Sequence, residues 1–460
     1  MKTYQDLMAV GERDEDRIDF VKSAIEYHKG TDFYKNALIA QDYAKRRNTT
    51  IVTYQKLLYT LSGKAVPDNY SANYKLCSGF FKRFVTQQSQ FLLGNGINWT
   101  EEGTSERLGE DFDSRVQKAG RYALIDGVTF GFWNLDHLEI FRLTEFVPFR
   151  DELDGSLKAG IRFWQVDQEK PMRAVLYEMD GYTDFLYDSE GGHIVNPKRG
   201  YVALTRTTPA EGMEIYDYEN YPSFPIVPLW ANDEHQSELI GIRESIDAYD
   251  LIKSGFANDI DDASLIYWTI SNAGGMDDVD LVKFVERMKT VKAAVVDDDG
   301  AKAEAHTIQI AYESREAILN RIRSDLYEDY MALDTKNLSA GGAITATQIE
   351  AAYEPLNEKT DLFEYNVVEF ISEILRLIGI QDNPTFTRSM IVNKQEEIQN
   401  VTQSAQYLSE EYVTKKILSI LGDIDQIDEI MDQKEEEDRN RTPVIVPQED
   451  DKEETNEDNE

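Results

Sequence analysis

The sequence has very little cysteine: Cys77 is the only one in 460 residues. A single thiol can form neither an internal disulfide nor a thiolate zinc cluster, so both kinds of stabilisation are excluded. The neighbours of Cys77, from Tyr74 to Phe81, are largely apolar. We therefore expect Cys77 to be a buried small apolar residue, and we expect a reducing compartment such as the cytoplasm.

Long hydrophobic runs are also absent from the sequence. No stretch reaches the roughly 18 apolar residues that a membrane-spanning helix needs. Residues 1–20 are polar and lack the apolar centre of a signal peptide. We therefore expect no membrane partner and no secretion signal.

Positive charge is scarce, because 48 Lys and Arg residues stand against 86 Asp and Glu residues, a net charge of −38. Tight binding of nucleic acid depends on Lys and Arg displacing counterions from phosphates, so the balance argues against a protein that grips DNA. It is compatible with a protein that must not hold DNA tightly. It is equally compatible with an acidic protein kept dispersed by its charge.

The motifs of common enzymes are missing. Gly63-Lys-Ala65 lacks the upstream glycine and the hydroxyl of a phosphate-binding loop. The five histidines are scattered and form no zinc-binding pair: His28, His137, His193, His235 and His306. We expect no catalytic residue, no cofactor and no metal site, and interpret the chain as a structural protein and not an enzyme.

Two acidic clusters leave a metal site open as an alternative. Asp297-Asp-Asp-Gly300 has some likeness to a calcium loop, but Val295 and His306 would occupy its first and twelfth positions, where carboxylates are needed. We interpret it as a turn. The second cluster consists of Asp259, Asp261 and Asp262. A solvated helix face is the favoured interpretation there, with a divalent-ion site as the less favoured one.

The strongest helix signal covers residues 233–263. Apolar residues recur there at steps of three or four, which places them on one face: Leu239, Ile242, Ile246, Tyr249, Ile252, Phe256 and Ile260. Polar residues occupy the opposite face: Glu238, Arg243, Glu244, Asp247 and Asp250. Asn232 or Asp233 is the expected N-terminal cap.

A second helix is predicted at residues 312–333, and its apolar face is formed by Leu319, Ile322, Leu326, Tyr330 and Leu333. The two helices are expected to pack through a shared core: Leu239, Ile242, Ile246, Tyr249, Leu319, Ile322 and Leu326. Between them lies an insertion of residues 265–311. It contains an apolar run at 265–270, a helix at 277–287 and a hairpin of strands 290–296 and 303–310.

Before this pair the sequence predicts helices and then a sheet. Helices are expected at 19–47, with a break at 30–32, at 69–93 and at 115–124. The period then changes to two, and strands are expected at 130–133, 139–149, 159–166, 174–178, 183–187 and 201–205. Turn signals between successive strands favour antiparallel pairing, so we predict an α+β fold.

After the pair, residues 334–343 form a small-residue loop that interrupts the helices. Thr345-Ala-Thr-Gln348 is a capping box that starts a helix reaching about Ile378, and Pro355 should kink it. Further helices are expected within 393–437. The remaining tail is acidic and is predicted to be disordered.

A series of short motifs leads into and along the predicted long helix: Pro225-Ile-Val-Pro228, Asn232, Ile246-Asp-Ala-Tyr-Asp250, Ser254, Asn258-Asp259 and Asp261-Asp262. This series resembles the portal proteins of tailed bacteriophages, in particular those of siphophages of Gram-positive hosts, and its strongest single piece is the Ile246–Asp250 run. Tyr43 followed by Asn48 is similar to a family segment whose glycine is not matched here. Phe91-Leu-Leu-Gly94-Asn-Gly-Ile97 is similar to another, with Gly96 where proline is usual.

The resemblance implies a ring of about twelve subunits at one capsid vertex, through which DNA is packaged and ejected. It implies a portal-type fold with a mixed α/β wing, a two-helix stem, a small α/β clip, a kinked long helix and an α-helical crown. The implied division is a flexible N-terminus at 1–19, wing 20–232, stem helices 233–264 and 312–333, clip 265–311, tunnel loop 334–343, kinked wing helix 344–380, crown 381–436 and tail 437–460.

The resemblance also implies partners and contact residues. The partners are other copies of the chain, double-stranded DNA held weakly and non-specifically, the terminase large subunit, a head–tail connector, a scaffold and the major capsid protein. The tunnel-loop residues expected near DNA are Lys336, Asn337, Ser339, Gly341 and Gly342. The clip residues expected to touch partners or neighbouring clips are Tyr267, Trp268, Arg287, Lys289 and Lys292.

The expected location is the virion, after synthesis in the bacterial host cytoplasm. Two other function classes stay open at this point. An acidic scaffold or adaptor of a phage particle would bind partners without forming a ring. A metal-dependent enzyme would use the acidic clusters.

Overall fold

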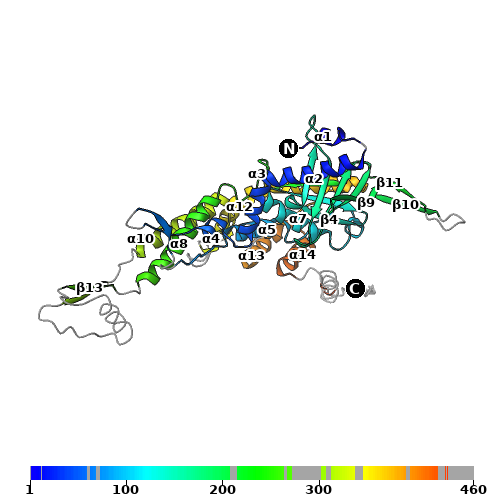
Figure 1. Ribbon diagram of the computed structural model, residues 1–460. Helices are drawn as coiled ribbons and strands as arrows, with labels where there is room; N and C mark the ends of the chain where they lie inside the picture. The colour runs from blue at the N-terminus through cyan, green and yellow to red at the C-terminus, as the bar shows by residue number, and fades with distance from the viewer. Residues whose placement is uncertain are drawn as a thin grey trace, which may run out of the picture. The chain divides into compact units, whose positions relative to one another are not determined.

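The computed structural model describes residues 2–11, 13–59, 63–68, 73–207, 215–263, 267–271, 302–306, 312–336, 346–389 and 394–422, together with Ile430 and Gln433. The chain divides into two compact units. The first contains Met1–Asp334 and Tyr353–Ser389, and the second contains Thr335–Ala352 and Met390–Glu460. Helices and antiparallel strands are both present, which confirms the predicted α+β class (Figure 1).

The helices that belong mainly to the first unit are α1 (Tyr4–Met8), α2 (Asp14–Gly30), α3 (Asp32–Ala44), α4 (Thr49–Thr53), α5 (Phe80–Leu93), α6 (Thr104–Leu108), α7 (Phe112–Asp126), α8 (Arg243–Ala263), α10 (Tyr312–Tyr330) and α12 (Ala346–Leu377). The predicted break at 30–32 is confirmed: the Thr31 hydroxyl accepts a bond from Tyr34 N and so starts α3. None of the helices in the described part of the chain combines the length and hydropathy needed to cross a membrane.

Two antiparallel sheets form the centre of this unit. The three-stranded sheet has the order β12 (Ile226–Trp230), β3 (Val128–Asn134), β4 (His137–Arg142). The five-stranded sheet has the order β5 (Phe146–Arg150), β6 (Leu157–Trp164), β7 (Met172–Glu178), β8 (Gly181–Tyr187), β9 (Gly192–Arg199). Shorter pairs are β1 (Leu57–Tyr59) with β2 (Ala65–Pro67), and β10 (Val202–Thr207) with β11 (Ile215–Glu219).

Period-two alternation divides the core into layers. Along β3, Phe130 and Phe132 face the five-stranded sheet, while Trp133 joins the core under α5, α7 and α12. On the other side of the five-stranded sheet, α2 packs through Phe20 and Ile25. A Cβ at Gly131 would lie 2.5 Å from the Phe370 ring, so only glycine lets α12 approach β3 this closely.

Several sequence-based boundaries are wrong. The predicted helix at 233–263 begins only at Arg243, because the preceding residues form turns with His235 (φ 55°) and Gly241 (φ 96°) in the left-handed region. Residues 73–79, predicted as helix, precede the start of α5 at Phe80 and form no regular element. The expected strand 139–149 is two strands separated by a 3-10 turn, Leu143–Glu145.

Other differences concern elements that the sequence did not indicate. Strands β1, β2, β9, β11 and β12 were not predicted, and β12 begins within the Pro225-Ile-Val-Pro228 motif. In the insertion, β13 (Tyr267–Ser271) pairs with β14 (Lys302–His306), so the apolar run is itself a strand of the hairpin. The predicted partner strand at 290–296 and the helix at 277–287 lie outside the described residues. Cys77 is half-buried and not fully buried as expected.

The second unit is helical where it is described. It contains α13 (Lys394–Ser404), a 3-10 turn (Ala405–Tyr407) and α14 (Glu410–Leu421), which α13 contacts. The Ser409 hydroxyl caps α14, and Gly422 at φ 100° ends it. The capping residue Thr345 predicted for α12 and the acidic tail at 437–460 lie outside the described residues. Pro355 is inside α12 as predicted.

Candidate functional site: contacts between the matched motifs

The distal half of α8 buries a polar face. Asp250, Ser254 and Asn258 are spaced four residues apart, which places them on one side of the helix. Their exposed fractions are 0%, 5% and 4%, whereas Ile260 is 52% exposed. The predicted polar face therefore includes a fully buried residue, Asp250, and the predicted apolar face is buried only in the first part of the helix.

This polar face is covered by residues 73–79, which run along α8. Alternate backbone N–H groups of an extended chain point to the same side, so each can meet one helix side chain. The hydrogen bonds are Ser78 N to Asp250 Oδ1 (2.8 Å), Leu76 N to Ser254 Oγ (3.0 Å) and Tyr74 N to Asn258 Oδ1 (2.7 Å). We call these three bonds the α8 ladder.

The same Asp250 also bonds to the segment around α4. Asn48 Nδ2 donates to Asp250 Oδ2 at 2.9 Å, and Asn48 Oδ1 caps α4 by accepting from Ile51 N. The Tyr43 hydroxyl lies 2.9 Å from Asn48 Oδ1 and also within hydrogen-bonding distance of the Asp247 carboxylate. Two motif segments some 200 residues apart in sequence therefore form one network.

Burial governs the electrostatics of this network. Burial raises the pKa of the Asp250 carboxyl above its ordinary value, and the hydrogen bonds from Asn48 and Ser78 oppose that rise. Burial also raises the pKa of the Tyr43 hydroxyl, with the bond to Asp247 acting in the same direction. Neutral donors satisfy the carboxylate, and the network thereby fixes the position of α8 relative to two other segments.

The motif residue Asn232 organises a turn and does not cap α8. Its Oδ1 accepts from Gln236 N at 3.1 Å, and its Nδ2 donates to Glu238 Oε1 at 2.8 Å. Glu238 in turn forms an ion pair with Lys359 of α12 at 2.5 Å. These residues line a hollow of about 420 Å³, and their polar groups are largely engaged with one another.

The structure locates the predicted stem core in the first unit. Leu239, Ile242, Ile246 and Leu326 are buried in one cluster. Tyr249 and Ile322 pack against that cluster while partly exposed, and Leu319 is half-buried. Helices α8 and α10 lie side by side (Figure 1).

The other predicted contact residues are only partly described. Lys336 is exposed, whereas Asn337, Ser339, Gly341 and Gly342 lie outside the described residues. Tyr267 and Trp268 belong to β13 and stand opposite His306 and Ala305. Arg287, Lys289 and Lys292 also lie outside the described residues. The roles of all these residues stay predictions.

The acidic clusters offer no metal site where they are described. Asp259 forms an ion pair with Arg315 of α10, which joins the two helices. Within the described residues, no group of three His, Cys, Asp or Glu side chains is arranged to hold an ion. The Asp297–Gly300 segment lies outside those residues.

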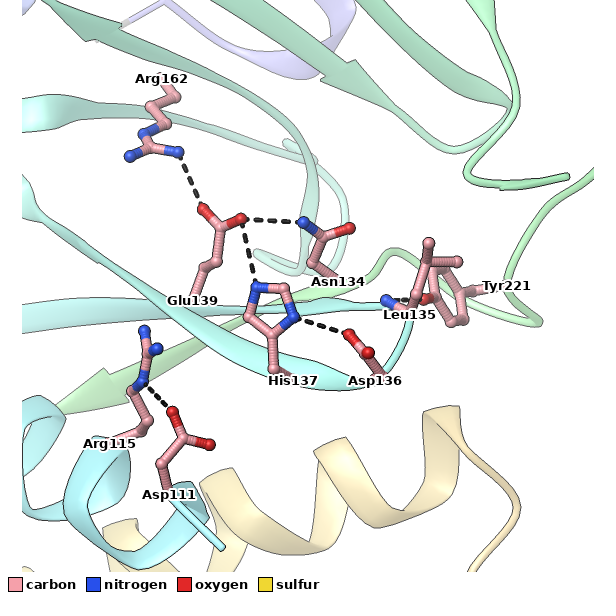
Figure 2. Close-up of polar contacts among 9 residues, drawn as sticks. All are labelled: Asp111, Arg115, Asn134, Leu135, Asp136, His137, Glu139, Arg162 and Tyr221. Carbon is pink, nitrogen blue, oxygen red and sulfur yellow. Dashed lines mark hydrogen bonds and ion pairs between the residues drawn. The ribbon is translucent and has the colours of Figure 1, made fainter. Parts of the chain in front are cut away.

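A second polar cluster surrounds the turn between β3 and β4 (Figure 2). Leu135 has φ 60°, and its N–H donates to the Tyr221 hydroxyl at 3.0 Å. His137 lies 2.8 Å from Asp136 and 3.7 Å from Glu139, and Glu139 also pairs with Arg162 at 2.9 Å. The hydrogen bond to His137 lowers the pKa of Asp136, although burial opposes it. These groups partner one another and fix the hairpin turn.

Comparisons with known proteins agree with the motifs. The family model described as "Phage portal protein, SPP1 Gp6-like" matches residues 22–440. The chain is 27% identical over 273 residues to the portal protein of Clostridium phage phiCD119, which covers 56% of this chain and 58% of that protein. It is 24% identical over 413 residues to the portal protein of Bacillus phage SPP1, which covers 82% of this chain and 76% of that protein.

The match to the family extends across nearly the whole chain, including all the described segments of the motif network. Portal proteins are structural components of the phage virion, which confirms the expectation that the chain is not an enzyme. The Gram-positive hosts expected from the resemblance agree with the Bacillus and Clostridium phages of the two relatives. This chain belongs to the SPP1 Gp6-like family of phage portal proteins.

Proposed function

We propose that the chain assembles into a ring of about twelve copies at one capsid vertex and forms the channel for genome packaging and ejection. The family membership supports this proposal, and so does the order of elements along the chain. The same ring would serve as the docking platform for the terminase large subunit and the head–tail connector. It would contact the scaffold and the major capsid protein from the other side.

The observation that carries the proposal is the braced helix pair. Helices α8 and α10 pack together, the Asp259–Arg315 ion pair joins them, and the β13–β14 hairpin comes between them in sequence. Through the α8 ladder, residues 73–79 also pack along α8, so that a third segment braces the helix pair. A pair of helices stiffened in this way suits the wall of a channel, because a wall must keep its shape while the duplex moves.

The remaining segments take the portal roles implied by the sequence. Residues 20–232 and 344–380 form the wing, residues 233–264 and 312–333 the stem, and residues 265–311 the clip. Residues 334–343 form the tunnel loop and 381–436 the crown. In this arrangement Lys336 and Asn337 approach DNA, and Tyr267 and Trp268 contact neighbouring clips or docked partners.

The charge of the chain fits a conduit. A channel must release every phosphate contact at each step of DNA movement, so tight contacts would stop translocation. Twelve copies at −38 each would carry roughly 460 negative charges, although only part of them would face the channel. Long-range repulsion would keep the duplex from adhering to the wall.

The test is the mass and symmetry of the purified protein, measured by native mass spectrometry together with negative-stain imaging. We expect closed rings of about twelve or thirteen copies with a central hole. Monomers or dimers at every protein concentration, with and without a co-expressed scaffold protein, would contradict the proposal. Including the scaffold removes the case in which assembly merely requires that partner.

A further inference from the structure

Charge is strongly segregated along this acidic chain. Residues 43–100 contain a single acidic residue, Asp68, although the whole chain has 86. The same stretch contains eight cations: Lys45, Arg46, Arg47, Lys56, Lys64, Lys75, Lys82 and Arg83. A local positive region of this kind is unexpected in a protein of net charge −38, and its position in the fold is informative.

Part of this region surrounds a hollow of about 150 Å³ between the end of α3, α5 and α7. Four cationic side chains line it: Lys45, Lys82, Arg121 and Arg142. We call these four residues and their surroundings the cationic hollow. Its other lining residues, which include Gln41, Thr86 and Tyr122, carry no negative charge.

One of the four cations is already neutralised within the fold. Arg142 donates twice to the fully buried Asp126 carboxylate, each time at 2.7 Å, and its guanidinium lies 4.2 Å from the Tyr122 ring centre. Burial raises the pKa of Asp126, and the pairing with Arg142 opposes that rise. Asp126 is therefore committed to Arg142 and is not available to the other cations.

The other three cations, Lys45, Lys82 and Arg121, are exposed. None of them forms an ion pair with any carboxylate in the part of the chain that the structure describes. Three like charges around one small hollow repel one another, so an anionic group placed there would be stabilised by all three. A volume of about 150 Å³ fits one or two carboxylates or a single phosphate group.

The number of cations distinguishes between these occupants. Binding of nucleic acid depends on many phosphate contacts made by Lys and Arg. Among the described residues, only four cations line the hollow, and Arg142 is already paired with Asp126. The hollow therefore suits single carboxylates on the surface of a protein partner better than a nucleic-acid backbone.

We propose that the cationic hollow forms one side of the contact between neighbouring copies of this chain and receives carboxylates from the acidic surface of the next copy. This inference rests on the proposed ring. A closed ring requires two different, complementary faces on each copy, because its interfaces are heterologous. Outside residues 43–100 the chain holds 85 of its 86 acidic residues, so an acidic second face is available.

The test compares charge-reversal variants of the full chain. Lys82→Glu and Arg121→Glu place a negative charge in the hollow, and Lys22→Glu makes the same change at an exposed position on α2 as the matched control. We expect each hollow variant to raise the protein concentration needed for half-maximal ring assembly at least about tenfold. The control should stay within about twofold of the unchanged chain. Circular dichroism establishes that all three variants fold.

Zero-length carbodiimide coupling provides an independent readout. In rings made from equal amounts of ¹⁵N-labelled and unlabelled chain, Lys45 and Lys82 should couple to Asp or Glu residues of the other isotope. The inference would be overturned if Lys82→Glu and Arg121→Glu assembled like the control and if rings of the unchanged chain gave no such mixed products. The proposed function would still stand in that case.

Two further outcomes can be distinguished from normal assembly of the hollow variants without mixed products. Hollow variants that assemble normally but lose binding of a 30-base-pair duplex would assign the hollow to nucleic acid and overturn the inference. An unchanged chain that forms no rings, even with scaffold, would contradict the proposed function itself.

Discussion

At the scale of single residues, Asp250 holds together three segments of the chain. Its two carboxylate oxygens accept from Ser78 N and Asn48 Nδ2 in a fully buried position. The Asp250→Ala substitution would leave both donors without a partner, and each buried unsatisfied donor costs about 1–3 kcal/mol. We expect a loss of about 2–4 kcal/mol, measured as a lower chemical-denaturation midpoint and faster amide exchange at residues 74–78.

The control for this prediction is Glu244→Ala at an exposed position on the same helix. Surface changes of this kind usually stay within about 0.5 kcal/mol. Equal effects of the two substitutions would show that the buried bonds of Asp250 add nothing.

His28 on α2 gives a prediction about pH. Its Nε2 lies 2.9 Å from Leu143 O, and because a carbonyl only accepts, Nε2 carries the hydrogen. Burial is the main cause that lowers the pKa of His28 below its ordinary value of 6.5, with Lys29 acting in the same direction against the Leu143 bond. Below about pH 6.5, His28 is therefore protonated in the unfolded chain but stays neutral in the folded chain until the pH reaches its lower folded-state pKa.

The stabilising contribution of neutral His28 is thus complete above pH 6.5 and is lost as pH falls toward its folded-state pKa, by up to about 1.4 kcal/mol per pH unit. Thermal unfolding between pH 7.5 and 5.5 should show a steeper decline for the unchanged chain than for His28→Gln. Parallel pH profiles would argue that His28 has the same pKa in both states.

The sequence identified the right residues in the motif network but not their role. Asp250, Ser254 and Asn258 stood out through the resemblance, and periodicity placed Asp250 on the polar face of the helix without indicating that this face is buried. Its partner Ser78 lies 172 positions earlier in the chain. No local pattern reports that a backbone strip will cover a helix face, so the burial of these polar side chains could not be predicted.

At the scale of elements, the packing of residues 74–78 on α8 depends on the side-chain-to-backbone hydrogen bonds of the α8 ladder. Ser254→Ala removes the acceptor for Leu76 N, and we expect a loss of about 1–3 kcal/mol. Hydrogen exchange of residues 74–78 should accelerate, while exchange in α2 should not change.

Gly255, the next residue on α8, supplies the matched control. A Cβ at Gly255 would meet nothing within 4 Å, and its replacement by Ala keeps all three ladder bonds. In a helix interior this change should stabilise by about 0.5–1 kcal/mol. Destabilisation by Gly255→Ala as large as that of Ser254→Ala would mean that α8 tolerates no substitution here, and the ladder would then explain nothing.

Element prediction succeeded where the signal was local. The break between α2 and α3 followed from the Gly30-Thr31-Asp32 sequence, and most strands of the two sheets followed from their alternation. It failed where tertiary contacts decide. Residues 233–242 have helical periodicity, yet Asn232 and Ser237 bond backbone groups of the turn and of α7, and these contacts outweigh local propensity.

At the scale of the whole molecule, charge predicts weak binding of DNA. The net charge of −38 opposes approach of any polyanion, and proteins that bind DNA non-specifically do so at about 10⁻⁴–10⁻⁶ M through many cations. Fluorescence anisotropy with a 30-base-pair duplex at about 150 mM salt should give a dissociation constant above 10⁻⁴ M. Submicromolar binding with a steep salt dependence would contradict this prediction. It would also contradict the argument that the channel wall avoids tight contacts with DNA.

The geometry of the α8 ladder has a further consequence. Four residues of a helix advance about 6.0 Å, whereas two residues of an extended chain advance about 6.6–6.8 Å. From one hydrogen bond of the ladder to the next, the axial advances of the helix and of the extended chain therefore differ by about 0.7 Å. Donors and acceptors can stay aligned only over a short length. Three rungs fit within the tolerance of a hydrogen bond, and a shift of the strip by a single residue would misalign all of them. The ladder thus fixes the register of residues 74–78 along α8. This segment should tolerate substitutions far more readily than insertions or deletions, because only the latter change the register.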